Sequence, residues 1–207
     1  MMGRFRAWSG KAGAAALALA LLSPVAAQAQ FSDSYNFLKA VKDADGQKVT
    51  DLIQKPGSTV INSRDVTSGE TALHLVIARR DATWLAFLLG KGANPNLTDN
   101  GGDTPLMKAV QARFQDGVIL LLSAGAQIDK ANGSGETPLI RAVQLHDLAV
   151  VRLLVAHGAN ADRRDSIAGM SARDYADRDS RTPGLVDALR AAKSSAAPKG
   201  PVQGPVF

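Results

Sequence analysis

The chain has 207 residues, with 24 Lys and Arg, 19 Asp and Glu, and a formal net charge of +5 at pH 7. It has no cysteine, which excludes disulfides, thiolate metal sites and a lipid-modified N-terminal cysteine. No basic run with interleaved aromatic residues is present, so we expect no nucleic-acid partner.

The first 29 residues are typical of a cleavable signal peptide. Three basic residues precede an apolar run from Ala12 to Leu22, and Ala27-Gln28-Ala29 has the small residues that a signal peptidase recognises. A helix over the apolar run would reach only about 16 Å, against a hydrocarbon core of about 30 Å, so no stable membrane anchor is expected. We expect cleavage after Ala29 and a periplasmic or secreted protein. Because three of the basic residues lie in this leader, the mature chain is closer to neutral than +5 suggests.

Three stretches further along the chain nearly repeat one another at a fixed spacing: GETALH (69–74), GDTPLM (102–107) and GETPLI (135–140). The threonines within them are 33 residues apart, and a serine follows the last after 34: Thr71, Thr104, Thr137 and Ser171. A glycine recurs at the same 33-residue step, at Gly92, Gly125 and Gly158. Two apolar segments lie between each threonine and the next glycine.

The residues of one repeat predict a pair of helices. Thr104 is a helix-capping residue, and Pro105 suits the first helical position because no amide hydrogen is needed there. Apolar residues then follow at the spacing of one helical face. A second helix is expected from Val118 to Ala124, apolar almost all round and therefore covered by neighbours. Gly125, which can adopt a positive φ, is expected to end it.

A Thr-Pro-Leu phrase with a period of 33 residues resembles ankyrin repeats. The resemblance covers roughly residues 35–191 and implies an all-α solenoid of stacked helix-turn-helix units with β-turn fingers. We expect a degenerate N-terminal repeat at 35–67, full repeats at 68–100, 101–133 and 134–167, and a C-terminal capping repeat at 168–191. Residues 192–207 are rich in Ala, Pro, Gly and Ser and are expected to form a disordered tail.

No pattern in the chain indicates catalysis. Its three histidines form no metal-binding pair, and no phosphate-binding Gly-Lys-Ser/Thr loop occurs, so we expect no metal, no cofactor and no enzymatic activity. The resemblance implies that His74 makes a structural hydrogen bond between units. Glu70, Asp103 and Glu136 recur before the capping threonine. They form either an acidic ladder along one edge or, the interpretation preferred here, acids favoured by the helix dipole.

The resemblance also implies that a partner contacts the finger tips and the exposed side of the inner helices, through residues that vary between repeats. The candidates in the fingers are Arg64, Val66, Thr67, Thr98, Asn100, Lys130, Asn132, Ser134, Arg164, Ser166 and Ile167. Those on the inner helices are Arg79, Gln111, Gln144 and Leu145. Val66, Leu145 and Ile167 are preferred, because an apolar side chain at an exposed position suggests a contact site. Most arginines of the turns and tips are expected to form a solvated rim: Arg79, Arg80, Arg113, Arg163 and Arg164.

The sequence therefore predicts a monomeric, non-catalytic scaffold of the bacterial periplasm that binds another protein. Two alternatives stay open. One is a secreted effector that acts on a host protein, because a signal peptide does not report on a second membrane. The other is a small-molecule or metal-binding enzyme, which would need a pocket with convergent titratable groups.

Overall fold

The computed structural model describes residues 24–179, 181–190 and 192. Residues 1–23 of the predicted leader and residues 193–207 of the predicted tail lie outside this part. The described residues form α-helices and one short 3-10 helix, and no strand is assigned among them. The helices are α1 (Pro24–Lys42), α2 (Gly46–Gln54), α3 (Ala72–Ala78), α4 (Ala82–Gly90), α5 (Pro105–Gln111), α6 (Gln115–Ser123), α7 (Pro138–Gln144), α8 (Leu148–Ala156), α9 (Ala172–Arg178) and α10 (Leu185–Arg190), with the 3-10 helix η1 at Val60–Asn62.

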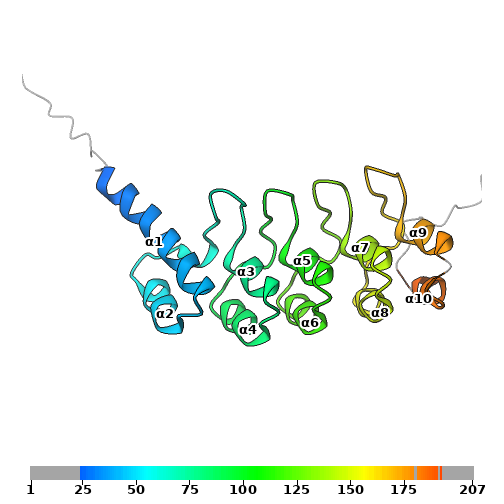
Figure 1. Cartoon of the computed structure of the whole chain (residues 1–207), viewed down its shortest axis with the longest axis horizontal. Helices are drawn as coiled ribbons and strands as arrows, with labels where there is room; N and C mark the ends of the chain where they lie inside the picture. Colours follow the sequence, from blue (N-terminus) through cyan, green and yellow to red (C-terminus); the bar gives the residue numbers. More distant parts are fainter. Residues whose placement is uncertain (1–23, 180, 191, 193–207) are drawn as a thin grey trace, which may run out of the picture.

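The helices pair into five units that stand in a single file (Figure 1). The inner helices α1, α3, α5, α7 and α9 each pack against the next one in the file, and each contacts its own outer partner. The outer helices α4, α6, α8 and α10 also pack in order. Four loops project from one side of the file, and we call them the first (63–70), second (96–103), third (129–136) and fourth (162–170) fingers. The all-α solenoid expected from the sequence is confirmed.

Local signals begin the inner helices as the sequence predicts, whereas the outer helix α6 begins at Gln115, three residues before the predicted Val118. The hydroxyl oxygens of Thr104 and Thr137 accept hydrogen bonds from amides one turn on, at 3.2 and 3.3 Å, and a proline follows each threonine. The glycine after each of the outer helices α4, α6 and α8 has a positive φ, 82° at Gly125. Between the inner and outer helices, however, the left-handed residues are Ala44, Arg80, Arg113 and His146, with φ of 52–55°. These four were not predicted, because glycine is the residue expected at such positions.

One hydrophobic core runs through all five units. The leucines predicted to lie in it divide into two groups: Leu88, Leu121 and Leu154 are fully buried, whereas Leu89, Leu122 and Leu153 are only partly buried against it. The prediction that the second helix is covered all round was therefore only half right. The outer helices have one layer of neighbours, and their far side faces solvent, where Ile119 on α6 is 40% exposed.

The described residues include both predicted boundaries. Helix α1 begins at Pro24 and continues through Ala29, after which cleavage is predicted. At the other end, Ala192, the first residue of the predicted tail, is buried against the last unit. The guanidinium of Arg173 donates to the carbonyls of Leu189 and Ala192, at 2.6 and 3.2 Å, and ties the end of α10 and Ala192 to α9. No helix in the described part of the chain is both long and apolar enough to cross a membrane.

Candidate protein-binding surface

The four fingers are joined to one another by a repeated backbone hydrogen bond, which we call the finger ladder. In each case the amide of one finger donates to a carbonyl of the finger before it: Asn100 to Ser68, Gly133 to Gly101, and Ser166 to Ser134, at 2.9–3.0 Å. The donor always follows an Asp or Asn, and the acceptor in each of the first three fingers precedes a glycine of positive φ. The ladder therefore sets the fingers in register, one behind another.

The glycines of the ladder allow the fingers to approach closely. A Cβ atom on Gly102 would lie 2.5 Å from the amide nitrogen of Gly133, and one on Gly135 would lie 2.7 Å from that of Ser166. A Cβ on Gly169, in the fourth finger, would meet nothing within 4 Å, because no finger follows. The spacing of the first three fingers thus requires glycine, which has no Cβ.

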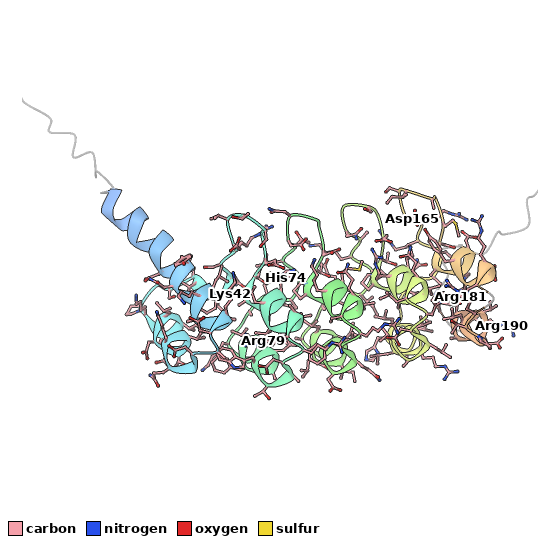
Figure 2. All side chains as sticks on the ribbon, in the orientation of Figure 1. Lys42, His74, Arg79, Asp165, Arg181 and Arg190 are labelled. Carbon is pink, nitrogen blue, oxygen red and sulfur yellow. The ribbon has the colours of Figure 1, made fainter. Side chains whose placement is uncertain are left out.

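Each later finger is held in shape by the side chain of the Asp or Asn that begins its tip. One side-chain oxygen of Asp99, Asn132 or Asp165 accepts two or three amides of its own finger. Burial alone would raise the pKa of Asp165, but the Tyr175 hydroxyl, 2.7 Å away, and these amides hold that pKa below its ordinary value. Asp165 lies in the fourth finger, above α9 (Figure 2). These hydrogen bonds hold the backbone of each tip in one shape and so set which of its side chains point outward.

Ion pairs join the fingers to the inner helices. Lys108 on α5 lies 2.8 Å from Asp99 and 3.2 Å from Asp103, and Arg141 on α7 lies 2.5 Å from Glu136. Burial alone would lower the pKa of Lys108, but the two carboxylates outweigh it and raise that pKa above its ordinary value. In the last unit the charges are exchanged, since Asp174 on the helix pairs with Arg164 of the finger at 2.9 Å.

The structure places the predicted contact residues in two groups. The candidates of the first and fourth fingers are exposed: Arg64, Val66, Thr67, Arg164, Ser166 and Ile167. Asn100 of the second finger and Arg79 after α3 are exposed as well. The remaining candidates are partly buried: Thr98, Gln111, Lys130, Asn132, Ser134, Gln144 and Leu145. The most accessible apolar candidates are Val66, 80% exposed, and Ile167, 79% exposed, at opposite ends of the finger row.

The expectation that Leu145 is exposed was wrong. Its side chain packs partly buried against the core, and its carbonyl accepts a hydrogen bond of 2.6 Å from Arg113. Asn132 and Gln111 are likewise used within the fold, because both donate to the carboxylate of Asp103, at 3.0 Å each. Lys130 donates to the carbonyl of Asn96 at 2.9 Å. A partner would have to compete for these groups.

Three of the arginines expected in a solvated rim also connect parts of the fold. Arg79 donates to the carbonyl of Val41 at 2.7 Å and lies over the ring of Trp84 at 5.4 Å. Arg113 likewise joins the third unit to the fourth, by donating to the carbonyl of Leu145. Arg164 donates to the carbonyl of Gly169 at 2.6 Å.

Neither interpretation of the recurring acids describes them fully. Asp103 and Glu136 do lie near helix N-termini, yet they pair with Lys108 and Arg141 and both accept from Asn132 of the third finger. Glu70 accepts from the hydroxyl of Ser68 at 3.1 Å. Asp103 and Glu136 therefore fasten fingers to helices, whereas Glu70 makes its contact within the first finger.

The histidines contact structural groups. The ring nitrogens of His74 join two units, as the resemblance implied, and His146 lies 2.9 Å from the carboxylate of Asp179. His157 contacts the carbonyl of Leu153 at 2.8 Å. Within the described ranges no group of three or more His, Asp or Glu residues is arranged to hold a metal ion.

Sequence reasoning missed one part of the surface, a groove of about 710 Å³ between α1 and the first finger. Helix α1 lines it with Tyr35, Leu38, Lys39 and Lys42, and the first finger with Arg64, Asp65 and Val66. Tyr35 is 68% exposed. The spacing of Tyr35, Lys39 and Lys42 along one helical face could have revealed it.

The comparisons with known proteins agree with this architecture. The family model "Ankyrin repeats (3 copies)" matches residues 37–132, and "Ankyrin repeat" matches residues 134–166. A fowlpox virus protein described as an ankyrin repeat protein is 34% identical over 79 residues, which are 38% of this chain and 23% of that protein. The nuclear factor NF-kappa-B p110 subunit of Drosophila melanogaster is 45% identical over 47 residues, 23% of this chain and 5% of that protein. The chain thus spans less than a quarter of either relative. The two family models together cover more than half of the chain, which therefore belongs to the ankyrin-repeat family, whose repeats generally mediate protein–protein interaction.

Proposed function

We propose that this protein is an exported, non-catalytic scaffold that binds one partner protein through its finger row and the adjoining inner helices. The observation that carries the proposal is the pair of exposed aliphatic side chains, Val66 and Ile167, held on the first and fourth fingers. An isolated exposed apolar side chain is common, but these two stand at the two ends of one rigid row.

The first and fourth fingers share a construction that the middle two lack. Their tips, 65–69 and 165–169, are one residue longer than 99–102 and 132–135. An arginine braces each long tip by donating to the carbonyl of its glycine: Arg64 to Gly69 and Arg164 to Gly169. The two aliphatic side chains therefore project from the taller ends of the row, with glycine-rich tips between them.

Stacked helices lie about 8–10 Å apart, so three steps of the file set the two long tips roughly 25–30 Å apart. A partner that covers both must present a surface at least that wide. Contact would remove Val66 and Ile167 from water, and full burial of such a side chain is worth about 1.5–3 kcal/mol. A folded domain of the partner suits this geometry better than a single short peptide across the whole row.

Export rests on the leader in residues 1–29, and it places the scaffold in the periplasm or outside the cell. Fractionation of cells into cytoplasm, periplasm and medium tests this part directly. Protein found in the periplasm without the leader would support it. Protein retained in the cytoplasm with the leader intact would contradict it.

The binding surface is tested with Val66→Asp and Ile167→Asp, singly and together. Ile119→Asp is the matched control, because Ile119 is an exposed aliphatic residue on the outer side of α6, away from the fingers. Immobilised protein should capture one partner from periplasmic extract in a saturable manner. We expect the double variant to lose at least tenfold in affinity, since two apolar contacts are replaced by charges, and the control to bind normally. Capture that is unchanged in the double variant would contradict the proposed surface.

A further inference from the structure

The finger ladder has an unused donor at its first finger. In each later finger the amide after the Asp or Asn of the tip donates to the finger before it. The equivalent residue of the first finger is Val66, which follows Asp65. Asp65 takes the next two amides, of Thr67 and Ser68, at 2.9 and 3.0 Å. The amide of Val66 has no hydrogen-bond partner among the described residues, because no finger precedes the first.

The groove beside α1 occupies the place where a preceding finger would stand. Val66 is part of its wall, and on α1 the apolar surface comes mainly from the exposed Tyr35, because Leu38 at its base is only 5% exposed. In Figure 1 α1 runs past the base of the first finger and leaves that side of the finger without a neighbour. The equivalence of the fingers directs the amide of Val66 toward this groove.

Two cations at the groove have donors to spare. Lys39 is paired with Asp43 at 2.7 Å, but Lys42 lies 3.9 Å from the nearest oxygen of Asp65. Figure 2 shows Lys42 on α1 near the first finger. Arg64 donates through Nε to its own finger, and its terminal nitrogens have no hydrogen-bond partner in the part of the chain that the structure describes. Two carboxylates also line the groove, but Asp43 already accepts from Lys39 and Asp65 from the amides of its own finger. The donors of Lys42 and Arg64 are therefore the cationic groups with capacity for a further partner.

From this arrangement we propose that the groove binds an extended segment of the partner protein, with an apolar and an acidic side chain. A main-chain carbonyl of the segment accepts from the amide of Val66 and so extends the finger ladder by one strand-like step. The apolar side chain packs against Tyr35 and Leu38, and the carboxylate pairs with Lys42 and Arg64. This inference rests on the proposed protein-binding function and assigns one part of it to a site.

A second copy of this chain is a less suitable occupant. The fourth finger does offer an unused acceptor, the carbonyl of Ala168, to which no described residue donates. The surface around that end of the stack, however, carries exposed charged side chains, among them Arg181, Asp187 and Arg190. Ile167 and Val186 are apolar and exposed at that end, but head-to-tail stacking would set Arg164 of one copy beside Arg64 and Lys42 of the next, cation against cation.

The probe for the test is a phage-displayed library of random ten-residue peptides, selected on the whole chain. We expect enriched peptides to combine an apolar with an acidic residue and to bind Tyr35→Ala at least tenfold more weakly. The double variant Lys42→Gln, Arg64→Gln should weaken binding by about tenfold, through the loss of charged hydrogen bonds. Val66→Ala keeps the amide, whereas Val66→Pro removes it. Their affinities should differ by about threefold or more.

A measurement on the unmodified chain guards against misfolding of the proline variant. In ¹⁵N-valine-labelled protein, the amide proton of Val66 should exchange rapidly with water when free. It should become protected and shift downfield when an enriched peptide is added. Sedimentation of the chain alone should show no head-to-tail assembly.

The outcomes separate this inference from the proposed function. Peptides that bind the Tyr35, Lys42/Arg64 and Val66 variants as tightly as they bind the unmodified chain would overturn the proposed peptide site. So would a Val66 amide whose exchange and chemical shift do not change when peptide is added. If the partner's capture still depends on Ile167, the scaffold function survives that result. Assembly of the chain that Val66→Pro abolishes would assign the groove to a second copy and overturn the peptide proposal. Failure to enrich any peptide would also overturn it.

Discussion

His74 on α3 and Asp103 of the second finger join two neighbouring units: Nε2 of the imidazole lies 3.0 Å from the main-chain oxygen of Asp103. The amide of Thr71 donates to the other ring nitrogen, Nδ1, at 3.1 Å. Since Nδ1 accepts from that amide, Nε2 carries the proton and donates to the carbonyl. The native structure thus contains a neutral imidazole, and protonation of Nδ1 would break the hydrogen bond that this nitrogen accepts from the amide of Thr71.

The stability of the protein should therefore depend on pH through His74. Burial lowers the pKa of His74 below its ordinary value of 6.5. The unfolded chain then takes up a proton below pH 6.5 that the folded chain does not, so stability is complete above that pH and falls as pH decreases toward the lowered pKa. Urea unfolding between pH 7.5 and 5 measures this. His74→Gln, which does not titrate there, should show a shallower loss. An equal slope in both proteins would exclude His74 as the cause.

A methyl group at the finger ladder should destabilise the stack. Gly102→Ala places a Cβ against the amide of Gly133 and also forces alanine into a φ of +81°. We expect a loss of about 2–4 kcal/mol, from left-handed strain and a disrupted hydrogen bond. Gly169→Ala is the control, since it has a φ of +65° but open space around the new atom. It should lose only about 1–2 kcal/mol. Equal losses in urea unfolding would mean that the close approach of the fingers contributes nothing.

The two sides of an outer helix should respond differently to truncation. Leu121 and Ile119 lie on the same helix, α6, but Leu121 is fully buried and Ile119 faces solvent. Leu121→Ala should cost about 2–5 kcal/mol because it leaves a cavity between units. Ile119→Ala should change stability by about 0.5 kcal/mol or less, as surface substitutions usually do. Calorimetric unfolding of both variants checks this. A large loss for Ile119→Ala would indicate that the outer side is covered by another molecule.

The last unit should depend on a single arginine. Arg173 on α9 donates to Asp162, Leu189 and Ala192, and so connects the fourth finger, α9 and the end of α10. Arg173→Ala should speed amide exchange throughout α10 and lower stability by about 2 kcal/mol, through the loss of several charged hydrogen bonds. Arg178→Ala, an exposed position on the same helix, should leave α10 protected. Unchanged exchange in Arg173→Ala would show that packing alone holds α10.

Much of the fold could be predicted because its causes are local and repeated. The capping threonines, the prolines after them and the glycines after the outer helices act within one unit, so a single sequence with a 33-residue period reveals them. The core leucines follow from the same period. The partial exposure of Leu122 and Leu153 does not, because hydropathy cannot tell an outer helix with one neighbouring layer from a helix covered on every side.

The candidate surface was harder to predict. Residues of similar character ended in different roles: Val66 and Ile167 are exposed, whereas Leu145 packs against the core. Arg79 and Arg113 stood in turns typical of solvated residues, yet each reaches a carbonyl more than thirty positions away in the sequence. Whether such a side chain is exposed or packed depends on its distance from the neighbouring unit. That distance cannot be deduced from the sequence of one repeat.

The sequence by itself determined that this chain forms repeated pairs of helices, where the threonine-capped inner helices begin, and which apolar faces must be covered by a neighbour. Only the tertiary structure decided which polar groups the neighbours use and which remain free. The amide of Val66 is chemically like that of Asn100, but stacking gives Asn100 a preceding finger and leaves Val66 with none. The physical reason is that a hydrogen bond between fingers needs a finger in the preceding unit, and among the described residues α1 and α2 carry none before the first finger.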